Sequence, residues 1–139
     1  MKAIETTLDR PLEEVEKEVR ALLAGEGFGI LTEIDVAETL RAKLGVERQP
    51  LRILGACNPS LAHKALEVDP SLALLLPCNV VLEQAGEGTR VAIVDPVELL
   101  GGGASTAPGS SAGDELALLA ADAGARLRRV VDQLGGRPG

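Results

Sequence analysis

Residues 78–95 read CNVVLEQAGEGTRVAIVD, two runs of largely apolar residues separated by a short turn. Residues 78–84 and 89–95 are rich in the β-branched residues that favour strands. The four residues between them, Ala85-Gly86-Glu87-Gly88, supply the glycines that a tight turn needs. This pattern predicts a β-hairpin, and therefore antiparallel pairing within the sheet.

Further strands and helices are predicted on both sides of this hairpin. Short apolar runs predict strands at 2–8, 28–34 and 51–57. Apolar residues at helical spacing, together with capping residues, predict four helices. They begin after Asp9-Arg10-Pro11, at Asp35, at Asn58-Pro59 and near Leu116, and they end near Gly25, Leu44, Asp69 and Leu134.

The order of these elements predicts an α+β fold with a largely antiparallel sheet. The twenty residues between the strands at 51–57 and 78–84 are long enough to permit parallel pairing there instead. Helices on one face of the sheet would leave the other face to cover, and a homodimer would cover it economically. Residues 101–113, GGGASTAPGSSAG, are predicted to form a mobile loop.

Length and composition restrict the classes of function. A chain of 139 residues suits a single domain over 1–139, and its 45% hydrophobic content allows a packed core. The net charge of −7 and the single aromatic residue, Phe28, argue against nucleic acid as a partner. The N-terminus lacks the features of a signal peptide, and the longest apolar stretch is interrupted by Pro77 and Asn79. We therefore expect no membrane span, a cytoplasmic location and reduced cysteines.

Two Cys-Asn dipeptides mark the candidate site. Cys57 ends one predicted strand and Cys78 begins the next long one, so antiparallel pairing would place both at the same end of the sheet. The hairpin would bring the end of its second strand to the same rim, and the helix that follows Asn58 would add one histidine. The candidate ligand-binding residues are Cys57, Asn58, Cys78, Asn79, Asp95 and His63.

Several chemistries fit these residues. The cysteines could be inert buried side chains and the asparagines helix or turn caps. Cys57, Cys78, His63 and Asp95 form a permissible zinc set, although their spacing matches no known zinc motif. Cys57 could instead be a nucleophile, because a helix N-terminus lowers the pKa of a thiol. A fourth interpretation is a pocket in which Asn side chains and helix N–H groups hold a polar or anionic ligand.

Two neighbouring carboxylates are candidates for a general acid and a general base. Glu33 and Asp35 lie two residues apart at a strand end, where both could point to one face. Asp35 is better explained as a helix N-cap and Glu33 as a charge at the rim of the sheet.

Four segments resemble one known family. They are Gly27-Phe28-Gly29-Ile30-Leu31-Thr32-Glu33-Ile34-Asp35, Ile53-Leu54-Gly55-Ala56-Cys57-Asn58-Pro59, Leu75-Leu76-Pro77-Cys78-Asn79-Val80-Val81 and Asp95-Pro96. Over about residues 2–134 the chain resembles the domain-of-unknown-function family 302. The resemblance implies an architecture similar to that of TATA-binding protein, a curved antiparallel sheet with two main helices packed on one face. It supplies no catalytic residues, because the family has no established reaction.

The sequence thus leads to one hypothesis and two alternatives. The leading hypothesis is a cytoplasmic homodimeric module that binds a small ligand or a metal, with Cys57, Cys78 and His63 as metal candidates. The first alternative is a thiol-dependent enzyme or redox protein that uses Cys57. The second is a structural interaction domain with inert cysteines. No cofactor is identified by the sequence.

Overall fold

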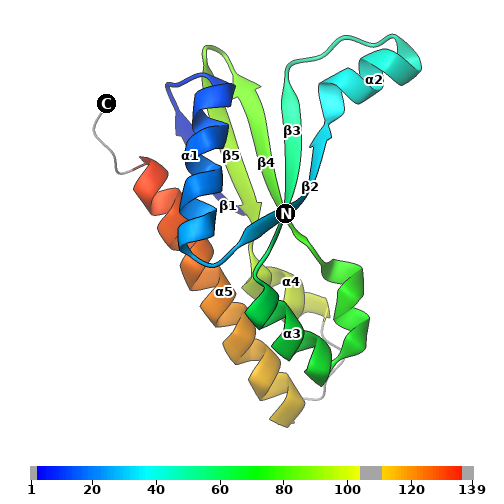
Figure 1. Ribbon diagram of the computed structural model, residues 1–139, viewed down its shortest axis with the longest axis vertical. Coiled ribbons are helices and arrows are strands. Elements are labelled where there is room, and N and C mark those ends of the chain that lie inside the picture. Colours follow the sequence, from blue (N-terminus) through cyan, green and yellow to red (C-terminus); the bar gives the residue numbers. More distant parts are fainter. Residues whose placement is uncertain (1–2, 104–110, 136–139) are drawn as a thin grey trace.

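The protein is built on an open sheet of five antiparallel strands in the order β1-β5-β4-β3-β2 (Figure 1). The computed structural model describes residues 3–103 and 111–135, with side chains described outside 101–112. The strands are β1 (Ala3–Leu8), β2 (Gly29–Asp35), β3 (Leu51–Cys57), β4 (Cys78–Ala85) and β5 (Gly88–Val94). The antiparallel pairing of β3 with β4 removes the parallel alternative that their long connection had left open.

The predicted hairpin forms the centre of this sheet. Ala85 pairs with Gly88, and Gly86 between them adopts a φ of 61°, a left-handed conformation that suits glycine. β1 pairs with β5 and forms one edge of the sheet. β2 forms the other edge and pairs with β3.

Two long helices cover one face of the sheet, as the predicted α+β fold requires. They are α1 (Leu12–Gly25) and α5 (Ser111–Gly135), and the shorter helices are α2 (Val36–Leu44), α3 (Pro59–Val68), the 3₁₀ helix η1 (Pro70–Leu75) and α4 (Pro96–Gly103). Their apolar faces meet the strands in one core. Its fully buried members include Val15, Val19 and Leu23 of α1, Leu127 and Leu134 of α5, and Leu54, Val80, Leu82, Val91 and Ile93 of the sheet.

A second, smaller apolar cluster lies at one end of the sheet. There α3, η1 and α4 gather against the N-terminal half of α5 (Figure 1). Ala65, Leu72 and Leu116 are its buried members. The candidate site lies between this cluster and the main core.

The largest departure from the predicted elements follows β5. Residues 101–103 end α4 and residues 111–113 begin α5, so these parts of the predicted loop are helical, and 104–110 lie outside the described residues. The signal for α4 was present, because Asp95-Pro96 repeats the Asn58-Pro59 pattern of a cap followed by proline. η1 was also not predicted. In the part of the chain that the structure describes, no helix is long and apolar enough to cross a membrane.

Candidate functional site

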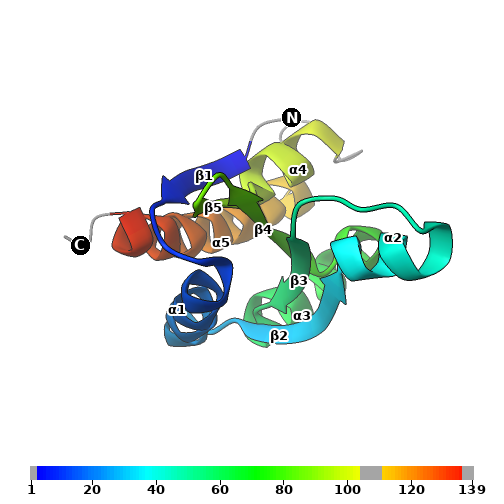
Figure 2. The same ribbon diagram turned by 90° about the horizontal axis from the view of Figure 1, so that it is seen from above.

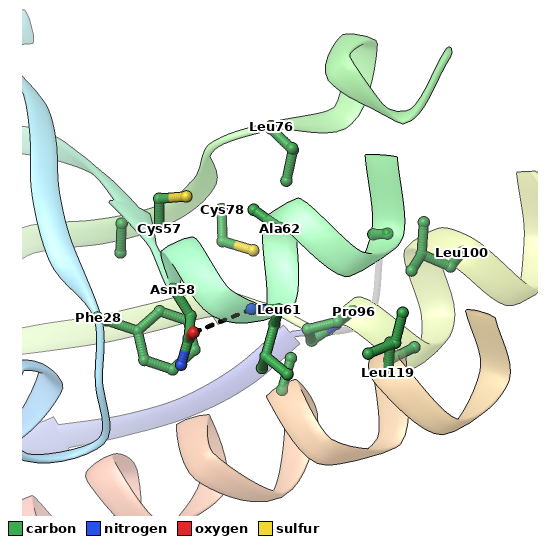
Figure 3. A pocket seen from close by; sticks show the side chains of 14 residues that line it. Phe28, Cys57, Asn58, Leu61, Ala62, Leu76, Cys78, Pro96, Leu100 and Leu119 are labelled. Carbon is green, nitrogen blue, oxygen red and sulfur yellow. Dashed lines mark hydrogen bonds between the residues drawn. The ribbon is translucent and has the colours of Figure 1, made fainter. Parts of the chain in front are cut away.

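Three of the six candidate residues line one apolar cavity of about 70 Å³ at the end of the sheet (Figure 3). Cys57 and Cys78 come from the neighbouring ends of β3 and β4, and Asn58 begins α3. The remaining wall is hydrocarbon from Phe28, Ala56, the helices α3, α4 and α5, and Leu76. The predicted meeting of the two Cys-Asn dipeptides at one end of the sheet is therefore found for these three residues.

The Cys78 side chain belongs to the covered face of the sheet. Cys78 pairs with Ala56, and residues opposite each other on antiparallel strands point to the same face. Ala56 is fully buried beneath the helices, so Cys78 faces them too. Burial, with a smaller contribution from the nearby Cys57, raises the pKa of the Cys78 thiol to about 11. At neutral pH the cavity therefore contains an uncharged thiol.

Cys57 follows Ala56 directly and is the last residue of β3. It lines the same cavity and lies near enough to Cys78 to contribute to the pKa shift there. Burial raises the pKa of the Cys57 thiol, which is the reverse of the lowering expected beside a helix N-terminus. The cause is the loss of contact with water, which disfavours the charged thiolate. The Leu61 N–H donates to Asn58 Oδ1 at 3.1 Å, so the helix directs its free donor to the asparagine.

Asn58 has a structural role at both ends of its amide. Its Oδ1 caps α3, and its Nδ2 donates to the Glu26 carbonyl oxygen at 3.3 Å. Gly27 permits this approach, because a Cβ at that position would lie 2.9 Å from Asn58 Nδ2. The side chain is buried and ties the end of α1 to the start of α3. Its Oδ1 and one of the two Nδ2 N–H groups are therefore engaged within the chain.

The other three candidates lie outside the cavity lining. Asn79 is exposed and pairs with Gly55 on the far face of the sheet. Asp95 is buried as the cap of α4, where its carboxylate accepts from the Val97 N–H at 3.0 Å and from Arg128 Nη2 at 2.7 Å. The His63 side chain is exposed on α3, with its Nε2 3.9 Å from a carboxylate oxygen of Glu67.

The predicted metal set is consequently not assembled. Among the described residues, no group of three or more His, Cys, Asp or Glu side chains is placed to hold a metal ion. The two cysteines line one cavity, but His63 is exposed on α3 and Asp95 caps α4, so neither joins them.

The paired carboxylates also have structural roles. Glu33 forms an ion pair with Arg20 of α1 at 3.1 Å. Asp35 accepts a hydrogen bond from the Glu38 N–H at 3.0 Å and so caps α2, as predicted. Neither residue lines the cavity beside Cys78.

From the sequence alone, the residues that shape the cavity are recognised only as parts of apolar helix faces. Ala62 and Ala65 of α3 face Ala120 and Ala123 of α5 across it. Alanines three residues apart on two facing helices leave space where larger side chains would fill it. This spacing is visible in the sequence, but it becomes a signal only when the two helices are known to face each other.

Comparison with known proteins places the chain in a family without assigning a reaction. The family model described as "Domain of unknown function DUF302" matches residues 4–134. The crystal structure of an uncharacterised conserved DUF302 protein from Bacillus stearothermophilus has a TM-score of 0.79 and 28% sequence identity, covering 94% of this chain and 97% of that one. A comparison with curated proteins gave no match. The fold, the four sequence segments and the extent of the match agree, and the chain belongs to the domain-of-unknown-function family 302.

Proposed function

We propose that the protein is a small-ligand-binding module whose cavity takes a small, uncharged and largely apolar group beside the Cys78 thiol. The observation that carries this proposal is the chemistry of the lining, which is almost wholly hydrocarbon around two cysteines whose thiols are protonated at neutral pH. Burying a charge in such a site without a partner would be costly, whereas an apolar group gains from leaving water. The polar or anionic ligand expected from the sequence is therefore replaced by an apolar one.

The geometry gives less support to a thiol-dependent enzyme. The thiolate is the nucleophilic form of cysteine, and burial raises the pKa of both Cys57 and Cys78. His63 is exposed and lies outside the cavity lining, so it supplies no base to either thiol.

We also propose that the protein acts as a homodimer in the cytoplasm. The helices α1 and α5 cover one face of the sheet, and a second copy would cover apolar side chains on the other. The net charge of −7 and the single aromatic residue continue to argue against a nucleic-acid partner.

Binding of 1-butanol tests the proposed cavity, with butylammonium as its charged counterpart. We expect 1-butanol to shift the NMR signals of the Ala62, Ala120 and Ala123 methyl groups saturably, and butylammonium to leave them unchanged. Ala123→Leu fills the cavity from α5 and should weaken 1-butanol binding at least about tenfold, or about 1.4 kcal/mol.

Ala121→Leu is the matched control, because Ala121 is exposed on the same helix. It should bind 1-butanol as the wild type does. Since an added side chain in a packed region costs about 1–3 kcal/mol, Ala62→Leu on α3 provides a second filling variant if Ala123→Leu is unstable. Shifts that do not saturate, or that both filling variants retain, would contradict the proposal.

A further inference from the structure

The segment between the core parts of β2 and β3 is an ordered arm without a core of its own. Within residues 31–50, all of which are described, no residue is buried, although they include the nine-residue helix α2. Helices this short are marginal in water unless they pack against something. In Figure 1, α2 projects from the ends of β2 and β3 away from the other helices.

This arm, residues 31–50, carries more than half of the large hydrophobic side chains that are exposed among the described residues. Seven large hydrophobic side chains are exposed among the described residues, and four of them lie on the arm. Leu44, at the end of α2, is 70% exposed and Leu31 is 64% exposed. Ile34 and Val46 are the other two.

The sheet presents an apolar row on the face opposite α1 and α5. Ala92, Val81, Ile53 and Ile34 are consecutive partners across β5, β4, β3 and β2, so they form one line across the sheet. Each alternates with residues that face the core, and the described helices α1 and α5 pack on that other face. Figure 2 shows α1 on one side of the strands and α2 projecting on the other.

We propose that a second copy of this chain occupies this open face and that α2 of each copy lies across the sheet of its partner. The proposal rests on the homodimer proposed above and names its interface. The chain carries both an unpartnered arm and an unpartnered apolar row, and a twofold axis would satisfy both in each copy at once. A different partner would have to match the two features separately.

The area available is close to what a stable dimer needs. Five strands about 4.8 Å apart and about seven residues long, at about 3.3 Å per residue, present a face of roughly 550 Å². A helix of about nine residues adds roughly 130 Å². Stable specific interfaces bury about 800 Å² per partner, so the arm and the face together approach that size.

The charges on this face are compatible with its burial against a copy of itself. Arg90 pairs with Glu5 at 2.7 Å and with Glu83 at 3.5 Å, and Arg48 pairs with Glu83 at 2.6 Å. These side chains thus neutralise one another within the chain. Two copies can approach despite the net charge of −7, because these four side chains present charges of both signs on this face.

Sedimentation equilibrium of the full chain tests the interface. We expect a dimer, and we expect Leu44→Glu to raise its dissociation constant at least about 100-fold. Leu118→Glu is the matched control, because Leu118 is 73% exposed but lies on α5. It should change the dissociation constant less than about threefold. Ala92→Glu alters the receiving face on β5, away from the arm, and should also weaken the dimer. Circular dichroism checks that each variant is folded.

The outcomes separate the arm from the homodimer itself. A dimer that survives Leu44→Glu but is broken by Ala92→Glu would overturn the role of the arm and leave the homodimer standing. A dimer broken only by Leu118→Glu would overturn the proposed interface. A wild-type chain that stays monomeric at about 1 mM would overturn both the interface and the homodimer.

Discussion

At the scale of single residues, two glycines allow the site to assemble. Gly27 admits the Asn58 amide, as described above. A Cβ on Gly55 would lie 2.2 Å from Thr32 Oγ1 and 2.6 Å from Pro77 Cγ, so any larger residue would push aside the chain that leads into Cys78. The absence of a side chain at position 55 therefore leaves room for Thr32 and for Pro77, the residue before Cys78.

Thiol modification tests the placement of the two cysteines. The pKa of the Cys78 thiol, about 11, is well above the value of about 8.5 for an unperturbed cysteine. Very little of this thiol is therefore ionised to the reactive thiolate at neutral pH. In Cys57→Ala we expect iodoacetamide to modify Cys78 at least about 100-fold more slowly when folded than in denaturant. In Cys78→Ala, folding should slow the modification of Cys57 by a smaller factor. Mass spectrometry gives both rates, and rapid modification of folded Cys78 would instead favour the nucleophile alternative.

At the scale of elements, α2 and α3 begin with the same kind of cap but differ in packing. Asp35 and Asn58 each accept a hydrogen bond from the N–H three residues ahead, at 3.0 and 3.1 Å. α3 buries Leu61 and Ala65, whereas α2 buries none of its residues. Equal capping chemistry therefore contributes to global stability only where the helix is joined to the core.

A pair of alanine substitutions tests this difference. Asn58→Ala removes a buried cap and the bond to Glu26, and should lower the free energy of unfolding by about 1–3 kcal/mol. Asp35→Ala should speed hydrogen exchange within α2, with little change in global stability. Chemical denaturation and hydrogen exchange measure the two effects. Equal losses of global stability from the two substitutions would contradict this assignment.

At the scale of the whole molecule, ion pairs join the helical layer to the sheet. Glu16 of α1 accepts from Arg52 of β3 at 2.7 Å and from Arg20 at 2.9 Å. Burial alone would raise the pKa of Glu16, but the hydrogen bonds from Arg52 and Arg20 outweigh it and lower that pKa. The charged form of Glu16 therefore stabilises the folded chain.

The pH dependence of stability follows from this direction. A carboxylate with a lowered folded-state pKa contributes stability above its unfolded value, near 4.5 for Glu16, and loses it as the pH falls through the folded value. We expect the free energy of unfolding to fall below about pH 4.5, and Glu16→Gln to make that fall shallower. Glu87→Gln, in the exposed hairpin turn, is the control. Denaturation curves across this range that are identical for wild type and Glu16→Gln would refute the assignment.

The sequence by itself determined the elements, because their signals are local. The glycines at 86 and 88 specify a hairpin, and Asn58-Pro59 specifies the start of α3. The hairpin makes β4 and β5 antiparallel, but the twenty residues between β3 and β4 left parallel pairing open. The structure shows that these two strands are antiparallel, which brings Cys57 and Cys78 to one end of the sheet. The same kind of signal at Asp95-Pro96 would have given α4.

Only the tertiary structure decided which groups of the rim share a site. Side chains alternate between the faces of a strand, and the covered face is fixed only when helices distant in sequence pack on it. That packing put Cys78 in an apolar cavity, excluded Asn79 and Asp95, and left His63 in solvent. It also left α2 without any buried residue. The sequence could not predict this, because no local signal states what a helix will pack against.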